Sequence, residues 1–101
     1  MSKYVLAFRG EPDRGSVPGE EQAWGAWFTE LGRTIVDFGN RVGQVERLDA
    51  EQRGDPAKET LTGYVVVEAA DIEHAVTLAR GCPGLLSGVS VEVAETVPMS
   101  G

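Results

Sequence analysis

Cysteine and histidine are almost absent from this sequence of 101 residues, which holds one of each, Cys82 and His74. A lone cysteine cannot form an internal disulfide, so the fold does not depend on an oxidising compartment. A structural zinc site needs four Cys or His ligands, which the chain cannot supply. We therefore expect no metal site, and we assign the protein no cofactor.

Basic residues and long apolar runs are also scarce. The chain has 9 lysine and arginine residues against 16 aspartate and glutamate residues, for a formal net charge of -7. A nucleic-acid-binding protein normally shows a basic face, so this balance argues against that class. No run approaches the roughly 18 apolar residues of a membrane span, and the apolar run at the N-terminus is too short for a secretory signal. We expect a cytoplasmic protein that binds neither nucleic acid nor membranes.

What the chain does contain is enough apolar residues for one core. Hydrophobic residues make up 42% of the sequence, more than a disordered acidic segment would have. A chain of this length has room for one domain. We expect a single domain over residues 1–97, followed by a flexible tail over residues 98–101.

Six segments carry the pattern of a strand or a helix. The expected strands cover residues 3–9, 41–49, 61–69 and 88–96. The expected helices cover residues 20–38 and 72–81. This order predicts an α+β fold with a ferredoxin-like βαββαβ arrangement, in which two helices cover one face of a four-stranded antiparallel sheet.

The first helix is predicted from an apolar stripe that recurs every three or four positions. The stripe consists of Trp24, Phe28, Leu31, Ile35 and Phe38. The pair Gly39 and Asn40 then supplies a stop signal for the helix. In the strand that should follow, over residues 41–49, a bulge at Gly43 would restore the alternation of apolar and polar residues.

Both faces of the central strands are expected to be apolar. We expect one face to carry Val5, Ala7, Val65 and Val67. We expect the other face to carry Tyr4, Leu6, Phe8, Tyr64 and Val66. One layer of helices covers only one face, so we predict a homodimer formed through the second.

Four runs of residues resemble the YCII-related family, and in particular its branch named for an Asp-Gly-Pro-Phe motif. These runs are 61–69 (LTGYVVVEA), 71–76 (DIEHAV), 79–83 (ARGCP) and 89–93 (VSVEV). The first strand and the helix with Trp24 also fit, so the resemblance covers nearly the whole chain. It implies a dimeric α+β barrel of ferredoxin-like subunits, with a cleft between the sheet and the helices.

The chemistry of that family does not carry over residue by residue. For some members the resemblance implies a His-Asp pair, and for one a role similar to a lyase that removes chloride from a chlorinated aromatic. In that pattern the histidine lies in the first helix region, but residues 20–39 contain none, so Asp37 alone is not a dyad. The Asp-Gly-Pro-Phe motif is also absent, and residues 53–59 (RGDPAKE) stand in its place.

The second helix carries the lone histidine and is followed by the lone cysteine. Asp71 is expected to cap this helix, and His74 falls toward its polar side, where we expect it to be exposed. Cys82 follows the helix C-terminus, whose negative dipole end disfavours a thiolate. We therefore expect a packed structural cysteine rather than a nucleophile.

Five residues are candidates for a ligand site. Arg9 ends the first strand and Tyr64 lies in the neighbouring central strand, so the two side chains can converge at a cleft. With Asp37 or Glu68 in reach, they would bind a small organic ligand that is anionic or phenolic. Trp27 would line a pocket or a dimer contact. Surface ion pairing is the alternative explanation for the charged residues.

Two functions remain open at this point. The first is a homodimer that binds a small organic ligand in a cleft between sheet and helices, with lyase-like or isomerase-like chemistry as one form of it. The second is a non-catalytic dimeric interaction or scaffold protein. The sequence leaves open whether the protein is an enzyme.

Overall fold

A computed structural model describes residues 1–11, 17–54 and 59–99. The strands are β1 (Ser2–Gly10), β2 (Ile35–Arg41), β3 (Arg47–Leu48), β4 (Arg53–Gly54), β5 (Thr60–Ala69) and β6 (Ser90–Glu95). The helices are α1 (Glu20–Leu31) and α2 (Ile72–Ala79), with single 3-10 turns η1 (Gly32–Thr34) and η2 (Pro83–Leu86). The expected tail is described as far as residue 99, and residues 100–101 lie outside the described part.

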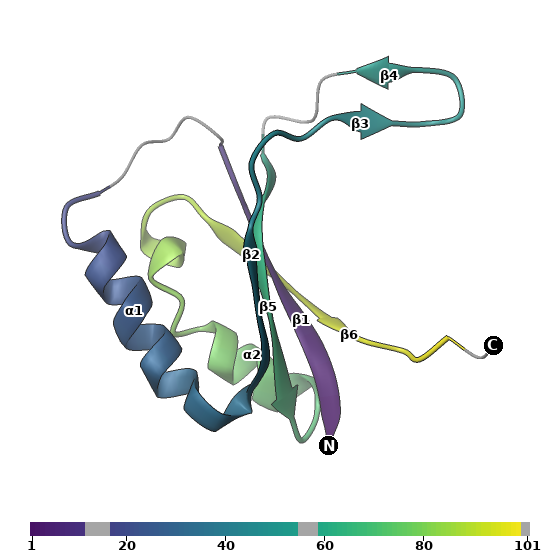
Figure 1. The fold of residues 1–101 in the computed structure, drawn as a ribbon. Helices are drawn as coiled ribbons and strands as arrows, with labels where there is room; N and C mark the ends of the chain where they lie inside the picture. Colours follow the sequence, from purple (N-terminus) through teal and green to yellow (C-terminus); the bar gives the residue numbers. More distant parts are fainter. Residues whose placement is uncertain (12–16, 55–58, 100–101) are drawn as a thin grey trace.

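The architecture is the predicted α+β arrangement. Four antiparallel strands form a sheet in the order β2-β5-β1-β6, and β3 pairs with β4 in a separate hairpin. Both helices lie on one side of the sheet, which leaves the other face open (Figure 1). The two strands expected to be central, β1 and β5, do occupy the middle of the sheet. No helix in the described ranges has the length and apolar character needed to span a membrane.

The register between β1 and β5 corrects the predicted faces. Leu6 lies opposite Val65, and Val5 lies opposite Val66. Directly opposed residues of antiparallel strands share a face. The helix-covered face therefore carries Leu6 and Val65, both fully buried, and the open face carries Val5 and Val66, so our grouping of Val5 with Val65 was wrong. Alternation orders the residues within one strand, whereas the phase between two strands depends on the register.

The first helix is shorter than predicted. It ends at Leu31, and Gly32 adopts φ 45°, a left-handed conformation that suits glycine. Residues predicted as the last part of the helix instead form β2, in which Ile35 lies opposite Val67. Branched and aromatic residues such as Ile35 and Phe38 are well suited to a strand. The apolar spacing that favoured a longer helix therefore crosses the boundary between two elements.

The second strand of the sheet is displaced from its predicted position over residues 41–49. That position holds the end of β2 and then β3, which belongs to the hairpin. The register of β2 against β5 shifts between Ile35 and Asp37 and again between Asp37 and Asn40, where Gly39 has φ 66°, and not at Gly43. A Cβ at Gly39 would collide with the backbone carbonyl of Tyr64 on β5. Gly39, predicted to stop a helix, instead allows the edge strand to approach β5 closely.

The C-terminal half follows the prediction more closely. Asp71 caps α2, because its Oδ1 accepts a hydrogen bond of 2.8 Å from the backbone nitrogen of His74. The imidazole of His74 is also occupied locally, since its Nδ1 accepts from the backbone nitrogen of Ala70 at 3.0 Å. Cys82 is buried, as expected for a structural cysteine. Within β6, Val91 and Val93 lie opposite the core residues of β1.

Candidate functional site

A cleft of about 1470 Å³ opens between the first half of α1 and one end of the sheet. Its apolar walls include Phe8, Trp24, Phe28, Phe38 and Val89. Its polar lining includes Glu20, Glu21, Asn40, Arg41, Thr60, Thr62 and Tyr64. The family resemblance implied a cleft between the sheet and the helices, and this cavity has that location. In the described ranges, no three His, Cys, Asp or Glu side chains gather in a way that could hold a metal ion.

The way α1 is anchored explains why the cleft is open. The buried residues of α1 are Trp27 and Leu31, which lie in its second half. Trp24 and Phe28 are only partly buried and pack at the margin of the core. An aromatic ring that is half covered presents one face to the cleft, so the apolar wall comes from α1 itself.

Ring contacts hold this wall in place. The ring centroids of Trp24 and Phe8 lie 5.0 Å apart with an interplanar angle of 85°, an edge-to-face contact. Phe28 lies 6.2 Å from Trp24, centroid to centroid. Edge-to-face pairs are a favoured geometry for aromatic rings. The wall is thus an ordered cluster that spans α1 and β1.

Glu20, the first residue of α1, holds the aromatic wall through hydrogen bonds. Its Oε1 accepts hydrogen bonds from the indole Nε1 of Trp24 at 3.3 Å and from the hydroxyl of Ser87 at 2.9 Å. The second of these bonds links the first turn of α1 to the segment after η2. A carboxylate with these two partners orients the Trp24 ring and places a charged group on the cleft surface.

The edge strand supplies the opposite side of the cleft. The amide Nδ2 of Asn40 donates to the hydroxyl of Tyr64 at 3.2 Å and joins β2 to β5 on the open face of the sheet, because Tyr64 lies opposite Ala7 on the face of Val5 and Val66. Arg41 follows on β2 and lines the cleft as an exposed cation. Phe38 is 72% exposed, so its ring is available at this edge. On the helix-covered face this side therefore combines the aromatic ring of Phe38 with the cation of Arg41.

Arg9 and Tyr64 were predicted to converge, and the structure gives them different partners. The Nε of Arg9 lies 3.3 Å from the Oε2 of Glu92 on β6. Tyr64 instead engages Asn40 on β2, the opposite edge of the sheet. The side chains of Arg9 and Glu92 are 40% and 63% exposed, so the pair lies at the surface, as the alternative of surface ion pairing requires.

The other three predicted residues are dispersed. Trp27 is 3% exposed and belongs to the core rather than to the cleft lining. Asp37 uses its Oδ1 to accept from the backbone nitrogen of Gly39 at 2.8 Å, a local turn contact. Glu68 lies opposite Lys3, at the end of the sheet away from the cleft. Of the five candidates, Tyr64 alone borders the cleft, and its side chain lies on the open face of the sheet because it is opposite Ala7.

Sequence reasoning missed Phe38 and Arg41 as cleft residues. Phe38 was predicted to end a helix and Arg41 to begin a strand, whereas one strand starting at Ile35 carries both to the cleft. Trp24 and Phe28 were predicted as part of the apolar stripe of the first helix and not as cleft residues. Only the packing of α1 distinguishes the buried Trp27 from the half-buried pair.

Comparison with known proteins places this fold in a family. The model of the YCII-related domain matches residues 32–97, well over half of the chain. The chain belongs to the YCII-related domain family. No curated protein matches it. The YCII-related match begins at Gly32, so it covers the edge-strand side of the cleft, while the aromatic wall on α1 precedes it.

Proposed function

We propose that this YCII-related protein binds a small organic ligand with an aromatic or apolar body in the cleft between α1 and the sheet. The observation that carries the proposal is the open aromatic wall of Trp24 and Phe28, held by ring contacts and by Glu20. Sites for small ligands are typically concave and mostly apolar, with a few fixed polar groups. This cleft has that composition.

The polar groups suggest how such a ligand would be oriented. Arg41 provides a cation at the edge strand, and the carboxylate of Glu20 provides a negative charge on the α1 side. A flat ligand lying on Trp24 and Phe28 would reach both sides. Proton transfer between groups placed in this way is the form that lyase-like or isomerase-like chemistry would take.

Ligand binding can be tested with a variant in which Trp24 is the remaining tryptophan. In Trp27→Phe, fluorescence reports on the cleft wall, and aromatic acids and lactones are the compounds to screen. A ligand in the cleft should change the Trp24 emission and raise the melting temperature, since binding at 100 times Kd adds about 2.7 kcal/mol of stability. Adding Phe28→Ser to this variant removes a ring of the aromatic wall and should weaken ligand binding at least tenfold.

The matched control is Leu86→Ser, a leucine that is 95% exposed and does not line the cleft. It should leave the affinity unchanged. The proposal fails if no compound alters the Trp24 emission, or if Phe28→Ser binds as tightly as its parent.

We propose in addition that the protein is a homodimer joined through the open face of the sheet. Val5 and Val66 lie on that face, and a second copy would cover them. This supports the second candidate function, a dimeric interaction or scaffold protein. Light scattering decides between one copy of 10.8 kDa and two. A monomer at micromolar concentration would contradict the dimer but not the cleft.

A further inference from the structure

The β3–β4 hairpin is an arm that leaves the body of the protein. It stands out from the end of the sheet on the side opposite the helices (Figure 1). Every residue from 46 to 54 is exposed, and Leu48 is 77% exposed. The Cα radius of gyration is 14.7 Å, compared with about 13 Å for a compact domain of 100 residues. The arm is therefore not packed against the rest of the chain.

Specific bonds give the arm a defined shape. Arg47 lies opposite Gly54, and Leu48 lies opposite Arg53. The turn is closed by a hydrogen bond of 2.9 Å from the backbone nitrogen of Asp49 to the carbonyl of Gln52. The carboxylate of Asp49 accepts from the backbone nitrogen of Gln52 at 3.0 Å. The hairpin is thus locally specified although it has no core of its own.

An ion pair braces the base of the arm. The guanidinium of Arg53 donates to the carboxylate of Glu46, with 2.6 Å between Nη2 and Oε1. This hydrogen bond raises the pKa of Arg53 above its ordinary value. The guanidinium of Arg53 is charged at all physiological pH values.

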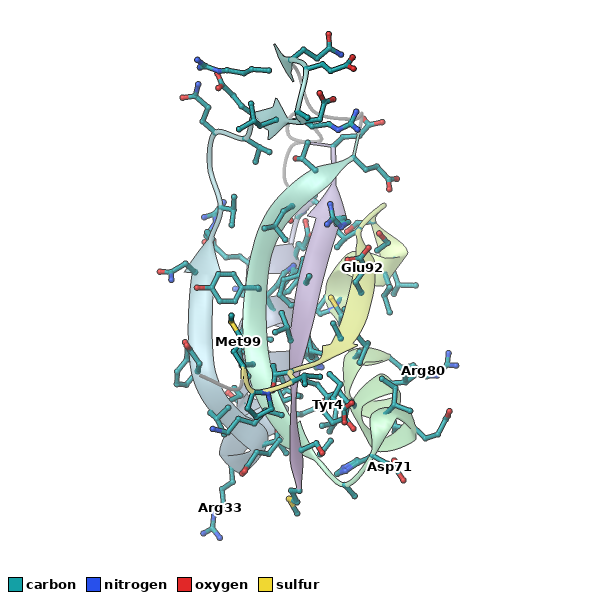
Figure 2. All side chains as sticks on the ribbon, turned by 90° about the vertical axis from the view of Figure 1, so that its right-hand side faces the viewer. Tyr4, Arg33, Asp71, Arg80, Glu92 and Met99 are labelled. Carbon is teal, nitrogen blue, oxygen red and sulfur yellow. The ribbon has the colours of Figure 1, made fainter. Side chains whose placement is uncertain are left out.

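A two-stranded hairpin is at best marginally stable in water without further packing. The arm also exposes the apolar side chain of Leu48 to water, so burying this side chain against a partner would be favourable. The arm projects on the same side as the open sheet face, and so does the segment that follows β6. In Figure 2, which looks at the open face, Met99 stands in front of the sheet, and its side chain is 95% exposed.

The area of the open face bears on what the arm does. The four strands have 9, 7, 10 and 6 residues, and at a spacing of about 4.8 Å and about 3.3 Å per residue they make a face of roughly 500 Å². A stable interface buries about 800 Å² per partner. The face alone falls short of this, and the arm and the C-terminal segment would supply the remainder.

We infer that the β3–β4 hairpin is a dimer arm that packs through Leu48 on a second copy of this chain. This inference rests on the proposed dimer. When two copies face each other across a two-fold axis, the arm of each lies beside the other, and one contact is made twice. Face and arm lie on one side of the molecule, so a second copy covers both at once.

Analytical ultracentrifugation of Leu48→Asp tests the arm. Leu48 is exposed, so the substitution leaves the folded monomer intact, as circular dichroism can verify. The dimer dissociation constant should rise at least tenfold. Leu86→Asp is the matched control, because Leu86 is also exposed and belongs to η2 on the helix side (Figure 1). It should dimerise as the wild type does.

Hydrogen exchange gives a second measurement on the unmodified protein. The amide of Asp49, which closes the turn, should exchange more slowly at concentrations where the dimer forms than after dilution to the monomer. A Leu48→Asp protein that dimerises normally, or an Asp49 amide insensitive to concentration, would overturn the arm and leave the sheet-face dimer standing. A wild-type protein that is monomeric throughout would overturn both.

Discussion

The indole Nε1 of Trp27 donates a hydrogen bond of 3.1 Å to the backbone carbonyl of Leu78. This bond joins the second half of α1 to the last turn of α2, at positions 51 residues apart. Trp27 is almost fully buried, and its ring also packs 5.8 Å from that of Phe8 on β1, centroid to centroid. One side chain thereby holds both helices against the same region of the sheet.

Replacing Trp27 should therefore destabilise the fold. In Trp27→Phe the carbonyl of Leu78 loses the indole donor and keeps the backbone nitrogen of Gly81, and the smaller ring leaves a space in the core. We expect the free energy of unfolding to fall by about 1–3 kcal/mol in urea titrations. Trp24→Phe is the comparison, because Trp24 is only partly buried, and it should cost less. Equal losses of stability in the two variants would mean that the hydrogen bond between the helices does not add to the stability of the fold.

Gly39 should not tolerate a side chain, whereas Gly25 should. In Gly39→Ala a methyl group meets the carbonyl of Tyr64, and the backbone at φ 66° adds about 1–3 kcal/mol of strain. Nothing lies within 4 Å of a Cβ at Gly25 in α1, so Gly25→Ala should stabilise the protein by about 0.5–1 kcal/mol. Thermal unfolding of both variants checks the pair. Similar melting temperatures would refute the bulge geometry.

The cap of α2 should contribute measurably to stability. Asp71→Ala removes the acceptor for the backbone nitrogen of His74, and we expect a loss of about 1 kcal/mol in the free energy of unfolding. Asp71→Asn keeps an oxygen at the same position and should retain most of the stability. If both variants lose the same amount, charge rather than capping is the cause.

Cys82 should react with thiol reagents only when the protein opens. Cys82 is 3% exposed, so thiol labelling of the native protein should be slow and should accelerate in denaturant. Leu86→Cys places a second thiol at an exposed position and serves as the fast control. Rapid labelling of Cys82 under native conditions would contradict its burial.

The sequence alone was sufficient to predict the elements whose pattern is purely local. The branched and aromatic run at residues 64–67 predicted β5, and Asp71 predicted the start of α2. These elements can be predicted from the residues of one strand or one turn, because alternation and capping involve neighbours in the chain. The order of elements then predicted the α+β architecture, which the structure confirms.

Only the tertiary structure decided where α1 ends and which residues face the cleft. Ile35 and Phe38 continue the helical spacing of Trp24 and Phe28, so the periodicity by itself favours a helix through residue 38. Hydrogen bonding to β5 gives these residues a strand instead, and register places Val5 with Val66. Pairing energies come from partners distant in the chain, and they overrule a local preference that is worth only tenths of a kcal/mol per residue. The cleft exists because Trp27 alone, among the aromatic residues of α1, is drawn fully into the core.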